Sequence, residues 1–227
     1  MASAQNLLER LYSGRRAALK RQILLDALDC FLEQGIETTS IEMIRAKSES
    51  SVGAIYHHFK NKEGIVAALF FSALDDQTAL RDEYLKQSKT LKDVVEALIY
   101  SYVDWVSEQP EFAKFLITAR FNIIEGEEQQ QLAQKNKSRN QKIFSLISNF
   151  EEFKAFSLIP HELLLSLVIG STESYCRAWL SQRVKADPKD YREILAKAAW
   201  NSLQDSVLRS CLINCPTLWG QIKECGF

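Results

Sequence analysis

Residues 35–62 read GIETTSIEMIRAKSESSVGAIYHHFKNK, and this stretch decides the fold. Its pattern predicts two very short helices joined by a tight turn. Thr39 or Ser40 is placed to cap the first helix, and Ser50 or Ser51 is placed to cap the second. Helices of about two turns are only marginally stable by themselves. A short helix with small and polar side chains on its outer face is suited to presenting that face, and the DNA major groove is its natural receiver.

The residues on both sides of this stretch also have a helical pattern. Residues 1–14 are expected to form a mobile arm, and apolar residues then recur at helical spacing over residues 16–34. Asn61 is placed to cap a long helix that runs to about Lys86. Further helices are predicted over residues 91–107, from Pro110 onward, and over residues 127–150, 161–184 and 189–212. The sequence therefore predicts an all-α protein of about nine helices.

Composition and charge narrow the class of protein. Apolar residues make up 46% of the 227 residues and charged residues 25%, which is typical of soluble domains. The start of the chain lacks the apolar region of a signal peptide. The longest apolar runs, of about eight residues, are too short to cross a bilayer. We therefore expect a cytoplasmic protein with no membrane partner. Five cysteines, an odd number, argue against a disulfide framework.

Net charge gives little support to a nucleic-acid partner, because it is only −1. Local clusters matter more than totals for contact with phosphates. One such cluster, Arg15, Arg16, Lys20 and Arg21, lies before and at the start of the first long helix.

The stretch also resembles a known family, the TetR-family transcriptional regulators. The residues that carry the resemblance to the N-terminal domain of these proteins are Gly35, Thr38, Thr39, Ile44, Gly53, Ile55, Tyr56, His58, Phe59, Lys62 and Ile65. They cover about a fifth of the chain. The resemblance implies an N-terminal three-helix helix-turn-helix domain with its arm over residues 1–62. It implies a larger helical domain for effector binding and dimerisation over residues 63–227.

The sequence departs from the family pattern at the turn. Arg45 stands where a small residue is expected, and Ser48, Glu49 and Ser50 replace an alanine–glycine–valine turn. If the turn keeps its usual shape, Glu49 needs a positive φ that ordinarily favours glycine. Ser50 removes an apolar plug. These departures concern the geometry of the turn, not the motif.

The DNA contacts fall into two kinds, because phosphate contacts fix the register and base contacts give specificity. By resemblance, Tyr56 and Lys62 are expected to contact phosphates. Small side chains at Gly53 and Ala54 permit a close approach, and Val52 suits thymine methyl groups. The predicted DNA-binding residues are Thr39, Ser40, Arg45, Ser51, Val52, Gly53, Ala54, Tyr56, His57 and Lys62. For Thr39 and Ser40, the alternative role is helix capping without DNA contact. For Arg45, the alternative is a side chain that lies along the protein surface.

The middle helices are rich in aromatic residues, which fits a pocket for a small hydrophobic effector. The predicted pocket residues are Phe70, Tyr102, Trp105, Phe112, Phe115, Phe121, Phe144 and Tyr175. Aromatic residues at helical spacing are equally the mark of an ordinary core, and the sequence leaves both interpretations open.

By resemblance, helices 161–184 and 189–212 form a four-helix interface with a second copy of the chain. Small residues permit close approach there and larger ones supply buried area. The predicted interface residues are Leu167, Gly170, Ser171, Ser174, Leu195, Trp200 and Leu203. The alternative is the core of a monomer.

These features favour a ligand-responsive dimeric repressor that a small hydrophobic effector releases from a palindromic operator. The alternative is an all-helical carrier of small molecules that no longer binds DNA. No nucleophile–base pair or phosphate loop is present in the sequence, so we expect no enzyme activity and no cofactor. Neighbouring helical residues such as His57 and His58 point about 100° apart, so we expect no metal site.

Overall fold

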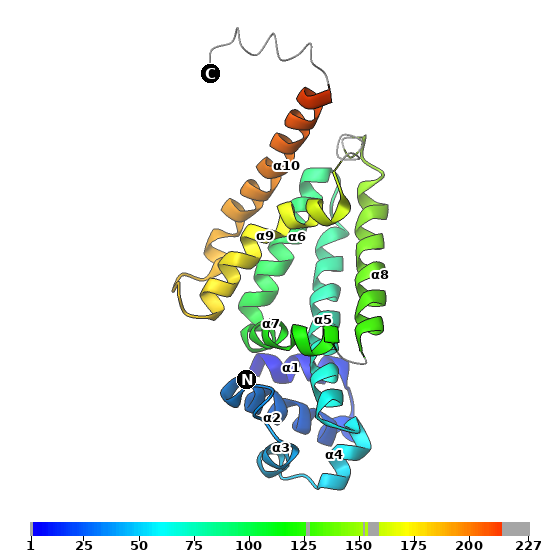
Figure 1. The fold of residues 1–227 in the computed structure, drawn as a ribbon, viewed down its shortest axis with the longest axis vertical. Coiled ribbons are helices and arrows are strands. Elements are labelled where there is room, and N and C mark those ends of the chain that lie inside the picture. Colours follow the sequence, from blue (N-terminus) through cyan, green and yellow to red (C-terminus); the bar gives the residue numbers. More distant parts are fainter. Residues whose placement is uncertain (1, 126–127, 152, 154–158, 215–227) are drawn as a thin grey trace. The chain divides into compact units, whose positions relative to one another are not determined.

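The computed structural model describes residues 2–125, 128–151, 153 and 159–214 (Figure 1). This part of the chain forms ten α-helices and contains no strand. The helices are α1 (Ala2–Leu11), α2 (Ala18–Gln34), α3 (Ile41–Ser48), α4 (Val52–Phe59), α5 (Lys62–Leu85), α6 (Leu91–Glu108), α7 (Pro110–Glu125), α8 (Gln129–Ile147), α9 (His161–Leu180) and α10 (Arg192–Asn214). The predicted all-α class is confirmed, with ten helices where about nine were expected.

Packing divides the chain into two compact units. The first comprises Met1–Asp82 and Asp104–Asn140, and the second comprises Glu83–Val103 and Gln141–Phe227. The domain boundary predicted after residue 62 is based on expected function, does not coincide with a boundary between these units, and stays a prediction. No described helix combines the length and apolar character that crossing a membrane requires.

The N-terminal residues differ from expectation, because most of the predicted mobile arm is helix α1. Ala4, Leu7 and Leu8 share one helix face and are fully buried. The end of α1 is held as well, since the Arg21 guanidinium donates hydrogen bonds to the carbonyls of Tyr12 and Gly14. The prediction missed the helix because it did not weigh the apolar spacing within this short segment.

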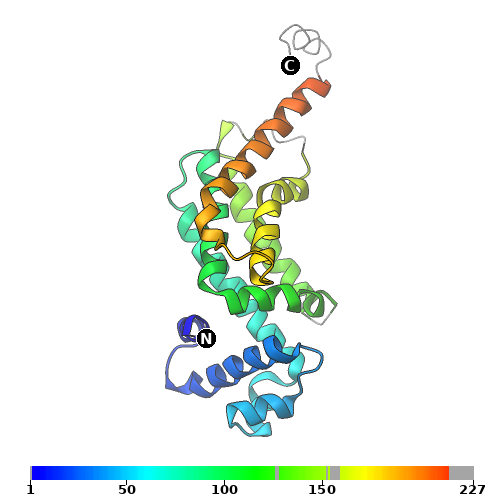
Figure 2. The same ribbon diagram turned by 90° about the vertical axis from the view of Figure 1, so that its left-hand side faces the viewer.

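Helix α2 organises the first unit. It packs against α1, α3 and α7 (Figure 2). Ile23, Leu24 and Leu28 are fully buried. Phe31 stacks on Phe115 of α7, with ring centroids 5.9 Å apart. The apolar face predicted for residues 16–34 is therefore the face that holds α3 and α7 in place.

A second tie in the first unit passes through Asp76 on α5. Its carboxylate accepts hydrogen bonds from the Arg10 guanidinium of α1 at 2.7 Å and from the Trp105 indole N–H at 3.0 Å. Trp105 is 2% exposed, so its indole N–H requires such a partner. Asp76 thus joins α1 to the C-terminal end of α6.

In the second unit, α9 and α10 form an antiparallel pair. The Tyr175 ring meets the Tyr191 ring edge-on, with centroids 5.8 Å apart, and the Tyr175 hydroxyl donates to the Ala186 carbonyl. Asp187 accepts a hydrogen bond from the Lys189 amide and so caps the short 3-10 helix before α10. Cys176 faces the interior of this unit, and burial raises the pKa of its thiol to about 12.

The junction between α4 and α5 is unusually tight. Asn61 caps α5 by accepting a hydrogen bond from the Gly64 amide at 2.8 Å, as its position in the sequence predicts. A Cβ atom on Gly64 would lie 2.0 Å from the Phe59 carbonyl oxygen. Lys60, between the helices, has a φ of 64° and a ψ of −48°. The orientation of α4 relative to the start of α5 therefore depends on glycine at position 64.

We predict that Gly64→Ala lowers the free energy of unfolding by about 1–3 kcal/mol, because the added methyl group overlaps backbone that must move. Urea unfolding followed by circular dichroism measures the change. Gly53→Ala is the matched control, since its added Cβ would meet only the Ser51 hydroxyl, at 4.0 Å. That control should gain about 0.5–1 kcal/mol from the better helix former. Equal stabilities of the Gly64 variant and the native protein would contradict this account of the junction.

Candidate nucleic-acid interface

Helices α3 and α4 both begin at a serine cap. The Ser40 hydroxyl accepts a hydrogen bond from the Met43 amide at 3.2 Å, and the Ser51 hydroxyl accepts one from the Ala54 amide at 3.1 Å. Each cap satisfies one of the amides that a helix leaves unpaired at its start. Of the alternatives in the sequence, Ser40 and Ser51 are therefore the caps.

The turn between these helices keeps its shape in spite of its unusual residues. Glu49 has a φ of 50° and a ψ of 26°, which is the left-handed conformation expected of a residue in place of glycine. A side chain with a Cβ atom pays about 1–2 kcal/mol for this conformation. The turn therefore tolerates strain at Glu49.

The buried side of the turn contains a pair of serines. The Ser48 hydroxyl donates to the Ile44 carbonyl at 2.8 Å, and its oxygen lies 2.8 Å from the Ser50 hydroxyl oxygen. Because Ser48 has a single hydroxyl hydrogen, Ser50 is the donor in the second bond. Both residues are buried. A hydrogen-bonded pair thus stands where an apolar plug is expected, and it leaves neither hydroxyl oxygen unpaired.

Helix α4 has one buried face and one exposed face. Ile55 and Phe59 are buried, as the sequence predicts. On the other side, Val52 is 36% exposed and Tyr56 is 49% exposed. Ser51, Gly53 and His57 are exposed as well, and Ala54 is half-buried. The side chains proposed to meet bases and phosphates therefore lie on an accessible surface, which the DNA-binding prediction requires.

Lys62 has a structural role that the sequence did not indicate. Its ammonium group donates to the carbonyl of Ile36 at 2.9 Å and to the carbonyl of Glu37 at 3.3 Å. An ammonium group has three N–H donors. Lys62 can therefore keep both bonds and offer at most one donor to a phosphate. It ties the first turn of α5 to the segment between α2 and α3.

Two other predicted contacts are occupied within the protein. Thr39 is 1% exposed and its hydroxyl donates to the Gly35 carbonyl at 2.7 Å, a placement that favours the structural alternative. Arg45 forms an ion pair with Glu42 at 2.8 Å on the surface of α3. Exposed ion pairs contribute at most about 1 kcal/mol, so a phosphate could compete for this arginine.

Lys20 is a residue whose place the sequence analysis missed. Its ammonium lies 4.2 Å from the centre of the Tyr12 ring and 5.8 Å from that of Phe59. Burial lowers the pKa of Lys20, and burial followed by the charges of His57 and Lys20 lowers the pKa of His58. The sequence contained a signal for this partly buried position, because Lys20 stands three and four residues before Ile23 and Leu24 and therefore shares their helix face.

The predicted pocket residues belong to different surroundings. Phe70, Trp105, Phe112 and Phe115 are buried in the first unit. Phe121, in the same unit, is 71% exposed. Tyr102, Phe144 and Tyr175 are half-buried residues of the second unit. Because Phe115 packs on α2, its place agrees with the core alternative, and the effector-binding role of the set stays a prediction.

The predicted interface residues divide between the two faces of α9 and α10. Leu203 is buried within the pair, and Leu167, Leu195 and Trp200 are half-buried. Gly170, Ser171 and Ser174 form an exposed small-residue strip on α9. Further apolar side chains are exposed close by in the sequence, namely Leu163 (48%) on α9 and Ile194 (65%) on α10. The exposed part of the set is available to a second copy.

Comparison with known proteins shows which proteins this chain resembles. The sequence pattern described as bacterial regulatory proteins, tetR family, matches residues 23–69. The chain is 31% identical over 101 residues to the HTH-type transcriptional repressor AcnR of Corynebacterium glutamicum, which covers 44% of this chain and 51% of that one. It is 31% identical over 102 residues to the HTH-type transcriptional repressor Rv1474c of Mycobacterium tuberculosis, which covers 44% and 52%. The chain thus spans about half the length of these relatives.

Solved structures extend the likeness beyond the N-terminal region. A TetR family transcription regulator from Marinobacter aquaeolei has a TM-score of 0.69 at 16% identity, covering 83% of this chain and 96% of that one. FadR from Bacillus subtilis, solved in complex with stearoyl-CoA, has a TM-score of 0.62 at 17% identity, covering 78% and 96%. At such identities the likeness concerns the fold alone, and it confirms the predicted helical fold.

The strained turn gives a prediction. Glu49→Gly should raise the free energy of unfolding by about 0.5–1 kcal/mol, because glycine adopts the left-handed conformation without a steric penalty. Glu49→Ala removes the same charge but keeps Cβ, so it should leave stability nearly unchanged. Thermal unfolding of the two variants separates the backbone effect from the charge effect. A larger gain from alanine than from glycine would show that charge, not backbone conformation, is the source of any strain.

Proposed function

We propose that this chain is a transcriptional repressor of the TetR family of bacterial regulatory proteins and that it places α4 in the major groove of an operator. The observation that carries the proposal is the exposed outer face of α4, made of Ser51, Val52, Gly53, Tyr56 and His57. A helix of eight residues gains little stability alone. Its presentation on a capped, tightly joined scaffold is what a recognition helix requires.

The proposed contacts follow from this exposure. Tyr56 and the remaining donor of Lys62 bind phosphates and fix the position of α4, while Val52 and Ala54 contact thymine methyl groups. Ser51 and His57 are the polar side chains that reach base edges. Ser40 and Arg45 reach phosphates from the start and the middle of α3. Thr39 supports the segment before α3 through its buried hydroxyl.

We further propose that two copies pair through α9 and α10 and read a palindromic operator. A two-fold dimer presents two recognition helices to two half-sites, so the symmetry of the protein and that of the operator must agree. The strip of Gly170, Ser171 and Ser174 permits close approach of a partner helix, and exposed Leu163 and Ile194 supply apolar area. These exposed residues support the interface, and Leu203 supports it from within the protomer.

The proposed effector is a small molecule with an apolar body that shifts the population of DNA-binding conformations. FadR of Bacillus subtilis, whose fold is similar, holds stearoyl-CoA. In this chain, a link from α7 to the DNA-binding region is visible, because the Asn122 side chain donates to the Glu37 carboxylate at 2.7 Å. The stacked rings of Phe31 and Phe115 form a second link. Displacement of α7 would therefore reach α2 and the segment before α3.

The proposal assigns no catalytic role to any residue, and it competes with a carrier of small molecules that does not bind DNA. Binding to duplex DNA separates these two functions. A repressor should bind duplexes with an affinity that falls steeply as salt concentration rises, because phosphate contacts release counterions. A carrier should show no such binding. Selection from a random duplex pool would both make this test and identify the operator.

For the phosphate contact, we predict that Tyr56→Phe weakens binding about tenfold or more on every duplex, since a hydrogen bond to a charged group contributes about 1.5–3 kcal/mol. Fluorescence anisotropy with the selected duplex and with unrelated duplexes measures the loss. Tyr191→Phe is the control, because it removes the hydroxyl of another exposed tyrosine, in the second unit. A loss confined to one duplex sequence, or equal losses in both variants, would contradict a phosphate contact.

For the dimer, we predict that Gly170→Trp produces monomers that keep their helical content. A Cβ atom at this position meets no atom of the described chain within 4 Å, so the new side chain has space within the protomer but not against a partner. Light scattering gives the mass, and circular dichroism shows whether the protomer is folded. A dimer of normal mass would refute the assignment of this face.

A further inference from the structure

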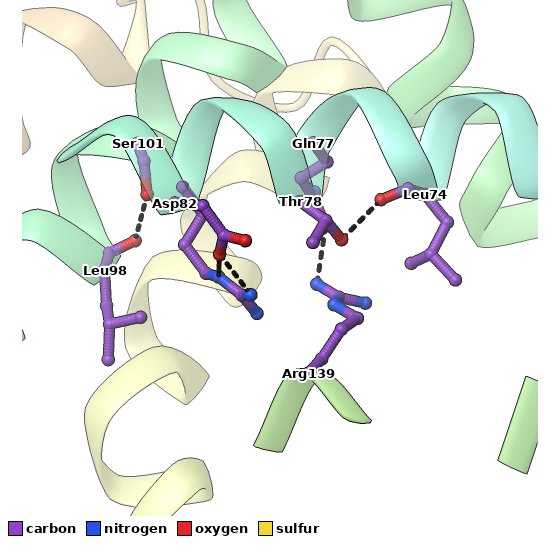
Figure 3. A network of polar contacts seen from close by, with 8 residues as sticks. Leu74, Gln77, Thr78, Asp82, Leu98, Ser101 and Arg139 are labelled. Atoms are coloured by element: carbon purple, nitrogen blue, oxygen red, sulfur yellow. Dashed lines mark hydrogen bonds and ion pairs between the residues drawn. The ribbon is translucent and has the colours of Figure 1, made fainter. Parts of the chain in front are cut away.

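A half-buried arginine of the first unit, Arg139, lacks a full set of partners. Arg139 extends from α8 toward the turn of α5 that carries Gln77 and Thr78 (Figure 3). One terminal nitrogen of its guanidinium donates to the Gln77 side-chain oxygen at 3.2 Å. Its Nε atom is buried and has no hydrogen-bond partner among the described residues. Buried polar groups are ordinarily paired, and an unpaired charged donor is especially costly, so Nε calls for an acceptor.

The charges around Arg139 do not supply that acceptor. Burial, and then the positive charge of Arg81, lowers the pKa of Arg139 to about 10. Two carboxylates favour its charged form, those of Asp82 and Asp75, but each holds another cation. Asp82 forms an ion pair with Arg81 at 2.5 Å, and Asp75 forms one with Lys135 at 2.5 Å. Arg139 is left with a neutral amide as its hydrogen-bond partner in the described chain.

The shortage of negative charge extends to a second helix. Arg81 is 6% exposed. Among the described residues, Asp82 is the one carboxylate that forms an ion pair with it. Arg120 of α7 also acts on Arg139 as a like charge. Arg81 and Arg139 are therefore like charges on neighbouring helices that are largely removed from water, and exposed Arg120 adds a third positive charge.

We propose that Arg139, supported by the positive charge of Arg81, binds the acidic group of a small-molecule effector, a carboxylate or a phosphate. A guanidinium offers two parallel N–H donors through Nε and a terminal nitrogen, which matches the paired oxygens of either group. The ligand would therefore supply the acceptor that Nε lacks. This inference rests on the proposed function, since it names the chemical class of the effector in that function.

The surroundings of Arg139 also indicate what the rest of the ligand is. Leu74 stands one turn before Thr78 on α5, and Leu132 stands two turns before Arg139 on α8; both are buried. Phe71, one residue beyond Phe70, is buried on α5 as well. Both helices that approach each other at Arg139 thus carry apolar side chains within two turns of it or of Thr78, so the effector that we propose is an anionic amphiphile and not a free inorganic anion.

The test compares ten-carbon probes that differ only in the head group: decanoate, decyl phosphate and 1-decanol. Isothermal titration calorimetry with the full-length protein should show that at least one of the two anionic probes binds at least tenfold more tightly than the alcohol. The difference between the two acids identifies which oxyanion the site prefers. Binding of the alcohol as tight as that of both acids, or no binding of either acid, would overturn the proposal.

Arg139→Met should reduce the affinity for the preferred acid at least tenfold and leave that for 1-decanol unchanged. The variant should fold, because a half-buried charge with incomplete pairing is replaced by an apolar chain of similar length. Lys135→Met is the matched control, since it removes one positive charge from the same helix, one turn away. Equal losses of acid binding in the two variants would overturn the assignment to Arg139.

Arg139→Lys gives a second readout, because it keeps the charge but lacks the paired donors. It should bind the acid more weakly than native protein and more tightly than the methionine variant. Duplex binding of the native protein, measured separately, distinguishes the two proposals. Acid binding through Arg139 without duplex binding would leave the site standing and remove the repressor function. Duplex binding without acid binding would remove the Arg139 site and leave the repressor function standing.

Discussion

The helix-turn-helix region depends on the bonds that the Lys62 ammonium group makes to the carbonyls of Ile36 and Glu37. These bonds join the first turn of α5 to the segment between α2 and α3, so both ends of the α3–α4 pair are fixed to one another. A hydrogen bond from a charged donor contributes about 1.5–3 kcal/mol, more than an ordinary one. The tight joint at Gly64 then sets the direction of α4. Lys62, which the sequence predicts as a phosphate contact, thus first holds α5 to the segment between α2 and α3, and its position beside α4 follows from these bonds.

The unusual turn shows how a motif persists when its customary residues change. The left-handed conformation at Glu49 is kept although glycine is absent, which means that the packing of α3 and α4 outweighs a penalty of about 1–2 kcal/mol. The loss of an apolar plug at Ser50 is compensated by a second change, since Ser48 accepts its hydroxyl hydrogen. Ser50 without Ser48 would bury an unpaired hydroxyl, whereas Ser48, which donates to the Ile44 carbonyl, can also accept the Ser50 hydrogen. The two positions therefore have to be considered as a pair, and comparison of each with the family pattern misses their compatibility.

Much of the fold could be predicted from the sequence, because apolar spacing and capping residues are local signals. They predicted the two short helices, each with the observed cap as one of two candidates, the cap at Asn61 and the buried sides of α2 and α4. The helix at residues 2–11 was missed because its apolar face spans only two turns. The site was less predictable. The exposed face of α4 followed from periodicity, but the partners of Thr39, Lys62 and Arg139 are set by contacts between segments distant in sequence. A residue type at a given spacing cannot reveal whether another part of the chain already occupies its donors.

The links between α7 and the helix-turn-helix region differ in strength, and this difference determines how a displacement of α7 could be transmitted. The Asn122–Glu37 hydrogen bond is exposed, and such bonds contribute about 0.5–1.5 kcal/mol net, so it breaks at little cost. Phe31 and Phe115 are almost fully buried, and burying a phenylalanine side chain contributes about 1.5–3 kcal/mol. A displacement of α7 would therefore carry α2 with it sooner than it would separate the rings. Glu37 is held through its side chain by Asn122 and through its carbonyl by Lys62. Of these two bonds, the exposed Asn122–Glu37 hydrogen bond is the one that would break or lengthen. We infer that α2 and α7 move as a packed pair and that the segment around Glu37 accommodates the motion, which would alter the support of α3 and α4 without unfolding either helix.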